Sequence, residues 1–132
     1  MEEKIKDVYK VEKLKGNDSL VEWHNSVIEK TEPELTVADV ARCIRQSIFV
    51  EVAYEMLIVY LLQDPYVGDM FPGELMEKAS EVDNELILKH SNSLKEIINK
   101  AESFIEQKDW ECDEDRDDFS ESVEKIKEKV NI

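Results

Sequence analysis

The sequence predicts an all-α fold: a single-domain helical bundle of about five to six helices around a central apolar helix. Three Gly and three Pro in 132 residues leave few turn formers, while Glu, Lys and Leu, which favour helices, are abundant. Apolar residues also recur at intervals of three and four, the helical period. The length suits one domain over residues 1–132, and 42% hydrophobic residues are enough for a core.

The first part of the chain predicts two short helices. Residues 2–15 are charge-balanced and weakly helical, and Gly16 ends them. A second helix begins at Asp18 or Ser19, and its apolar stripe is formed by Leu20, Trp23, Val27 and Ile28. Pro33 ends this part, because proline moves the preceding residue out of the helical region.

A long central helix is predicted over residues 37–63. Thr36 and Asp39 form a near capping box that marks its start. Within the apolar segment of residues 48–62, Glu51 and Glu55 are four residues apart. Both therefore lie on one solvent-facing stripe, and the other faces are buried.

Asp64 ends the central helix and opens the Gly/Pro-rich loop of residues 64–73. A short helix begins near Gly73. A longer one follows over residues 82–108, and its apolar stripe includes His90. Ser93 with Glu96 is a second capping box, so a break at residues 91–93 is an open alternative.

The last predicted helix begins at a cap on Asp117 or Asp118. Its apolar stripe repeats at intervals of four, three and four: Phe119, Val123, Ile126 and Val130. A homodimer through this stripe is one alternative, in which the protein is an adaptor or scaffold.

The charge balance restricts the partner. With 32 acidic and 17 basic residues, the formal charge of −15 repels nucleic acid and anionic lipid, and it favours a basic protein. Residues 48–62 are shorter than the roughly 20 residues of a membrane span. No apolar leader begins the chain, and two isolated cysteines predict free thiols in a reducing cytoplasm, with Cys43 in the core and Cys112 near the surface.

We expect neither catalysis nor a cofactor. His24 and His90 belong to no metal or nucleophile motif, and three glycines form no phosphate-binding loop. We expect the imidazole of His90 to lie in the core and to be hydrogen-bonded there. Carboxylate pairs are so frequent in this chain that the sequence singles out none for acid–base chemistry.

The acidic run ECDEDRDD at residues 111–118 allows three interpretations. A calcium loop beginning at Asp113 would use Asp115, Asp117 and Glu124, but Asp118 stands where such a loop requires Gly, so no metal is predicted and a calcium-binding protein stays an alternative. In the second interpretation the run is a solvated acidic loop that caps the last helix. In the third it is a docking surface for Lys and Arg side chains of a basic protein. Residues 1–62 carry a net charge of −4 and residues 63–132 one of −11, which favours docking.

The start of the central helix carries a second polar group. Asp39 and Arg42 are three residues apart and predict an ion pair on one face. Arg45 extends that face by one turn, and we expect it to pair with Glu74 of the following loop.

Residues 35–46 (LTVADVARCIRQ), followed by an apolar helix, Asp64-Pro65, Gly68 and Gly73-Glu74-Leu75, resemble the immunity proteins of bacterial contact-dependent growth inhibition systems. The resemblance covers residues 35–75. Its motif residues, for which we expect a structural role, are Asp39, Arg42, Arg45, Gln46, Gly73 and Glu74.

The resemblance implies a cytoplasmic protein without catalytic activity that binds, as a 1:1 complex, the toxic C-terminal domain of a cognate effector, often a nuclease. A nuclease must approach phosphate, so its active face is basic and an acidic protein can cover it. Electrostatic steering would also speed capture. We expect the toxin to contact acids of the second half: Asp64, Asp69, Asp109, Glu111, Asp113, Glu114, Asp115, Asp117 and Asp118.

Overall fold

The computed structural model describes residues 3–131, and within them the predicted all-α class is confirmed. The helices are α1 (Ile5–Tyr9), α2 (Ser19–Val27), the short 3-10 helix η1 (Glu32–Glu34), α3 (Val37–Arg45), α4 (Val50–Gln63), α5 (Glu74–Ser80), α6 (Asn84–Lys89), α7 (Ser91–Phe104) and α8 (Asp113–Val130). None of these helices has the length and apolarity needed to cross a bilayer.

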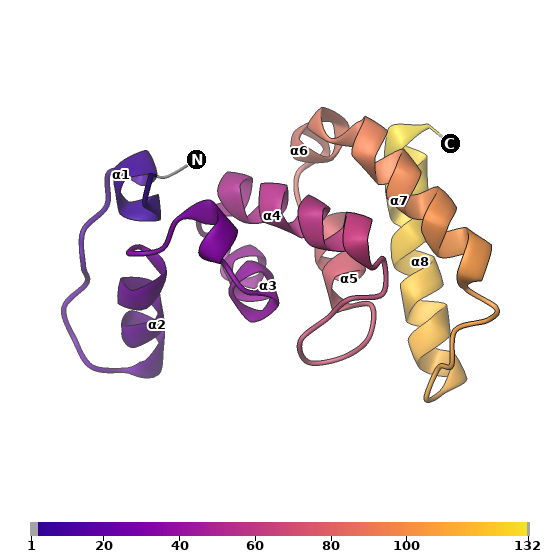
Figure 1. Ribbon diagram of the computed structural model, residues 1–132, viewed down its shortest axis with the longest axis horizontal. Helices are drawn as coiled ribbons and strands as arrows, with labels where there is room; N and C mark the ends of the chain where they lie inside the picture. The colour runs from indigo at the N-terminus through magenta and orange to yellow at the C-terminus, as the bar shows by residue number, and fades with distance from the viewer. Residues whose placement is uncertain (1–2, 132) are drawn as a thin grey trace.

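The helices follow one another along the long axis of the molecule in approximately chain order (Figure 1). α1 and α2 lie at one end, α4 lies in the middle, and α7 and α8 lie side by side at the other end. The apolar helix α4 contacts α3, α5, α7 and η1, as expected for a central helix. Its buried side chains belong to one core cluster, and Glu51 and Glu55 lie on its exposed face as predicted.

The predicted helix of residues 37–63 is divided in two, which is the first correction. Its start is as expected, because Thr36 and Asp39 exchange both hydrogen bonds of a capping box at 3.1 Å. The helix stops at Arg45, and Ser47 and Phe49 adopt left-handed backbone with φ of +56° and +53°. Phe49 is buried there, with its ring 5.0 Å from the ring of Tyr9. This apolar contact offsets the cost of left-handed backbone at non-glycine residues.

The predicted helix of residues 82–108 is also divided, directly before the open alternative of a break at residues 91–93: His90 ends α6 and precedes α7. Ser93 therefore lies inside α7 and caps nothing, and α7 ends at Phe104. At the N-terminus, the weak helix of residues 2–15 is reduced to Ile5–Tyr9 within the described residues. The prediction was five to six helices. Because of the two divisions, residues 3–131 contain eight α-helices.

The last helix begins earlier than the predicted cap at Asp117 or Asp118, because α8 starts at Asp113 with Cys112 as its N-cap. Asp113, Glu114 and Asp115 fill the first turn, where carboxylates are stabilised by the free N–H groups and the helix dipole. The acidic run is thus mainly helix rather than a loop.

Two alternative functions conflict with the position of α8. Residues 113–124, the hypothetical calcium loop, are continuous helix, so their ends lie about 16 Å apart along the axis and cannot surround one cation. The stripe proposed for a homodimer is already buried against helices of the same chain, and it consists of Phe119, Val123, Ile126 and Val130.

Candidate functional site

The loop of residues 64–73 and the start of α8 are joined by a cluster of three aromatic rings. The ring of Tyr66 lies 5.0 Å from that of Phe119 on α8 and 5.7 Å from that of Trp110, which precedes α8. Trp110 and Phe119 are 5.4 Å apart, and the ammonium of Lys108 lies over both Tyr66 and Trp110. Aromatic and cation–π contacts of this kind fix the loop against the helix.

Glu74, at the first position of α5, determines the shape of the loop. Its carboxylate is buried, with the residue 1% exposed, and Oε1 accepts hydrogen bonds from the backbone N–H groups of Asp69 at 2.7 Å and Met70 at 3.1 Å. Gly73 precedes it with φ of +84°, and a Cβ there would lie 2.7 Å from the ring of Phe119. The Gly-Glu pair of the motif therefore closes the loop and lets α8 approach.

These contacts bring together acids that are distant in sequence. We call acidic face the surface formed by loop 64–73, the connection to α8 and the first turns of α8 (lower edge of Figure 1). Asp115 and Asp118 of α8 line a small hollow with Phe71 and Pro72 of the loop. Asp64 and Asp69 line a larger hollow of about 380 Å³ beside Lys108.

All nine predicted acids of the acidic face have accessible side chains; Asp115 is half-buried and the others are exposed. Within residues 3–131, Asp117 alone among them has a cationic partner within 4 Å, the neighbouring Arg116 at 3.7 Å. Most of these carboxylates are therefore available to cations of another molecule. The nine are Asp64, Asp69, Asp109, Glu111, Asp113, Glu114, Asp115, Asp117 and Asp118.

The sequence interpretation missed the apolar part of this face. Met70 is 73% exposed and Phe71 is 40% exposed, at the tip of the loop. The adjacent Met and Phe between Asp69 and Pro72 were the signal that could have identified them, since aromatic and Met side chains are enriched at the centres of interfaces. Glu77 of α5, which lines the same small hollow, was also missed.

The polar group at the start of α3 makes its contacts within the chain, but its pairs differ from those predicted. Asp39 does not pair with Arg42; it accepts hydrogen bonds from the Lys30 ammonium at 2.6 Å and the Trp23 indole at 3.1 Å. Burial alone would raise the pKa of Asp39, but these bonds and the one from the Thr36 N–H outweigh it and lower the pKa. Arg42 instead stacks over the Trp23 ring, 4.7 Å from its centroid.

The predicted ion pair between Arg45 and Glu74 is wrong as well. Arg45 and Gln46 are exposed at the end of α3, whereas Glu74 is buried and its carboxylate binds the loop backbone. The sequence offered no signal for this arrangement, because the two backbone donors depend on how the loop folds.

Of the remaining candidate residues, Cys112 lies in the connection to α8, within the acidic face, whereas Cys43 and His90 lie outside it. Cys43 is buried and Cys112 exposed, as predicted, and burial, with the nearby Asp39, raises the pKa of the Cys43 thiol to about 12. His90 packs against the Tyr54 ring at 5.3 Å, but its Nε2 has no hydrogen-bond partner, contrary to expectation. In residues 3–131 no three His, Cys, Asp or Glu side chains gather in a way that could hold a metal ion.

Comparison with known proteins extends the resemblance beyond residues 35–75. A family model described as CDI immunity proteins, where CDI stands for contact-dependent growth inhibition, matches residues 5–97, more than two thirds of the chain. The match runs from α1 into α7 and leaves α8 outside it. No curated protein and no solved structure matches the chain. On the extent of the family match, the chain belongs to the CDI immunity proteins.

Proposed function

We propose that this immunity protein acts in the cytoplasm by binding the toxic C-terminal domain of its cognate effector, as a 1:1 complex, through the acidic face. The toxin is a nuclease with a basic active face, and the immunity protein covers that face without catalysing a reaction. The membership of the CDI immunity family supports the role, and the charge of −15 supports a basic partner.

One observation carries the choice of surface. Unpaired carboxylates surround two exposed apolar side chains, Met70 and Phe71, on a loop that Glu74 and the aromatic cluster hold in place. Apolar anchors at the centre and charged groups at the rim are the usual composition of a protein–protein interface. A fixed loop also loses little conformational entropy on binding, which favours tight association.

The carboxylates have a separate role from the apolar anchors. At physiological salt, exposed charges act over a Debye length of about 8 Å, so the acids orient an approaching basic domain and raise the association rate. Met70 and Phe71 then contribute mainly to the lifetime of the complex, because buried apolar contacts are lost in dissociation.

A pull-down identifies the toxin. The tagged protein is incubated with lysate of its source strain, and retained proteins are identified by mass spectrometry. We expect the basic C-terminal domain of a very large surface protein. The purified domain should degrade nucleic acid, and one equivalent of the immunity protein should abolish the activity.

A matched pair of variants tests the surface. Met70→Ser/Phe71→Ser removes the apolar anchors, and Leu14→Ser/Leu20→Ser removes two comparably exposed apolar residues near α2. We expect the first variant to lose neutralisation at equimolar toxin and the second to retain it. Equal neutralisation by both variants would exclude the loop tip from the interface.

A further inference from the structure

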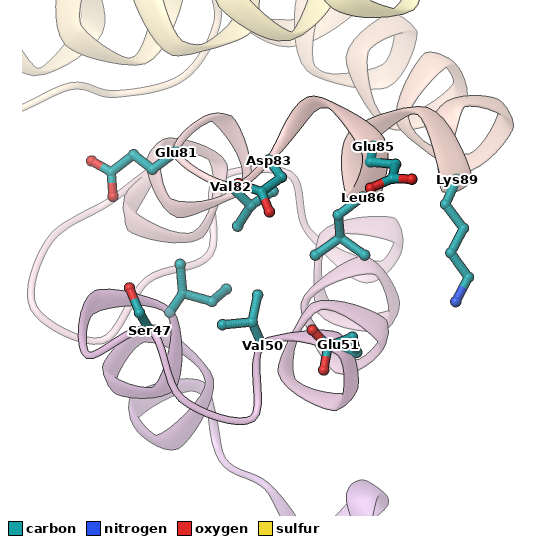
Figure 2. Close-up of a pocket in the computed structure, with 10 residues that line it drawn as sticks. Ser47, Val50, Glu51, Glu81, Val82, Asp83, Glu85, Leu86 and Lys89 are labelled. Atoms are coloured by element: carbon teal, nitrogen blue, oxygen red, sulfur yellow. The ribbon is translucent and has the colours of Figure 1, made fainter.

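A second concave surface lies away from the acidic face, between the turn that joins α3 to α4 and the turn that joins α5 to α6 (Figure 2). Its volume is about 600 Å³, larger than either hollow of the acidic face. We call it the α4–α6 cleft. The ten lining residues are Ile44, Ser47, Val50, Glu51, Glu81, Val82, Asp83, Glu85, Leu86 and Lys89.

The floor of the α4–α6 cleft is apolar. Val50 points upward from the start of α4, and Val82 and Leu86 point toward it from the opposite side (Figure 2). All three are half-buried, so an occupant with an aliphatic stem would remove further apolar surface from water.

The rim of the cleft is acidic, with four carboxylates and one ammonium. Figure 2 shows Glu81 at one end of the cleft, Glu85 and Lys89 at the other, and Asp83 directed over the centre. All five charged side chains, including Glu51 on the α4 side, belong to exposed residues.

Two of these carboxylates are not used by the fold. Asp83 occupies the N-cap position of α6, where an aspartate ordinarily accepts a backbone N–H, yet its side chain makes no capping bond. Neither Asp83 nor Glu85 has a cationic partner within 4 Å among residues 3–131, whereas Glu81 pairs with Lys78 at 3.4 Å and Glu51 accepts the Tyr9 hydroxyl at 3.0 Å.

The wall formed by the α3–α4 turn is a strained segment. Ser47 lines the cleft in left-handed backbone, and Phe49, two residues later, is in the same conformation. Left-handed backbone costs energy at a non-glycine residue, so it persists only where the surrounding structure maintains it. Such residues are concentrated at functional sites. The turn thus presents Val50 and Ser47 to the cleft in a fixed arrangement.

From this geometry we infer that the α4–α6 cleft binds an arginine side chain of the toxin, with its aliphatic stem on Val50, Val82 and Leu86 and its guanidinium between Asp83 and Glu85. An arginine fits better than a lysine, since a planar guanidinium can bond two carboxylates and is less strongly hydrated than an ammonium. The inference rests on the proposed function and adds a second contact to it.

One toxin domain is large enough to reach both surfaces. Gly73, at the acidic face, and Glu81, at the cleft, are the two caps of α5, about 12 Å apart along the helix axis. An interface that buries about 800 Å² on each partner is roughly 30 Å across.

The test compares dissociation constants for the effector domain recovered by the pull-down. Asp83→Asn/Glu85→Gln removes the two unused charges, and Val50→Trp fills the floor of the cleft. The control Glu12→Gln/Glu22→Gln, on exposed residues near α2, changes the net charge by the same amount as Asp83→Asn/Glu85→Gln. We expect the first two variants to bind five- to tenfold more weakly and the control to bind like wild type. Circular dichroism confirms that each variant is folded.

Modification of the toxin by phenylglyoxal identifies the occupant. One arginine should be protected in the complex with wild type and reactive in the complex with Asp83→Asn/Glu85→Gln, as read by mass spectrometry. Wild-type affinity in both cleft variants, or no arginine whose protection depends on the cleft, would overturn the inference and leave the acidic face untouched. Failure of wild type to bind the domain would instead refute the proposed function.

Discussion

Replacing Glu74 by Ala tests whether this carboxylate holds the loop that carries the exposed apolar tip. The substitution removes two hydrogen bonds to a charged acceptor, from the N–H groups of Asp69 and Met70. Such bonds contribute about 1.5–3 kcal/mol each, which gives a loss of about 3–6 kcal/mol. Loop N–H groups can regain hydrogen bonds to water, so we expect a value of about 3 kcal/mol.

Two further variants separate the contributions. Glu74→Gln keeps an oxygen at the same place but removes its charge, and should lose about 1.5 kcal/mol, because charge-assisted bonds are roughly twice as strong as neutral ones. Glu77→Ala is the control on the same helix, where the carboxylate lies 3.6 Å from the Lys78 ammonium, and it should lose less than about 1 kcal/mol.

Urea unfolding followed by tryptophan fluorescence measures all three variants, and thermal unfolding should show a midpoint about 12 °C lower for Glu74→Ala. Hydrogen exchange at the N–H groups of Asp69 and Met70 should accelerate in Glu74→Ala but not in Glu77→Ala. A Glu74→Ala variant as stable as Glu77→Ala, with unchanged exchange, would refute the role assigned to this carboxylate.

Three further predictions concern single residues. Desolvation by burial, with the charge of Lys89, lowers the pKa of His90 despite the opposing Glu55. Below a pH of about 6.5 the unfolded chain therefore binds a proton that the folded chain resists, and the free energy of unfolding should fall between pH 7 and pH 5. His90→Phe should reduce that fall in urea melts, and an equal fall would contradict it. Iodoacetamide should modify Cys112 alone in the folded protein and both cysteines in urea, as counted by mass spectrometry; two modified thiols in the folded state would contradict the burial of Cys43. Gly73→Ala should cost about 2–3 kcal/mol in urea unfolding, because φ is +84° and the new Cβ would lie 2.7 Å from a ring atom; a loss below about 0.5 kcal/mol would disagree.

The parts of the fold that sequence predicted correctly depend on local chemistry. The capping box of Thr36 and Asp39 starts α3 where expected, and the four-residue spacing of Glu51 and Glu55 located the exposed face of α4. Both are properties of neighbouring residues on one helix. The nine acids of the acidic face have accessible side chains because a carboxylate without a buried partner remains in water.

The parts that were missed depend on contacts between distant segments. No Gly or Pro marks the turn between α3 and α4, where the left-handed residues are Ser47 and Phe49. Phe49 is held there by packing against Tyr9 of α1, forty residues earlier in the chain. Likewise, Asp39 binds Lys30 and Trp23 rather than Arg42, because the fold brings α2 against α3. Local spacing carries no information on such pairs.

The α4–α6 cleft was invisible to sequence for a related reason. Its acids come from α4, from the α5–α6 turn and from α6, and they are ordinary surface residues in each segment taken alone. They form one rim because the unpredicted turn between α3 and α4 lies opposite the turn between α5 and α6.

The rate of association with the toxin domain tests the central claim most directly. Asp113→Asn/Asp115→Asn/Asp117→Asn removes three charges from the acidic face, and Glu121→Gln/Glu124→Gln/Glu128→Gln removes three exposed charges from the distal part of the same helix. Stopped-flow fluorescence at low and high salt should show association about tenfold slower for the first variant at low salt, nearly unchanged for the second, and similar for all three proteins at high salt. Equal slowing by both variants would mean that net charge alone steers the toxin, and an unchanged rate in the first variant would exclude the start of α8 from the encounter.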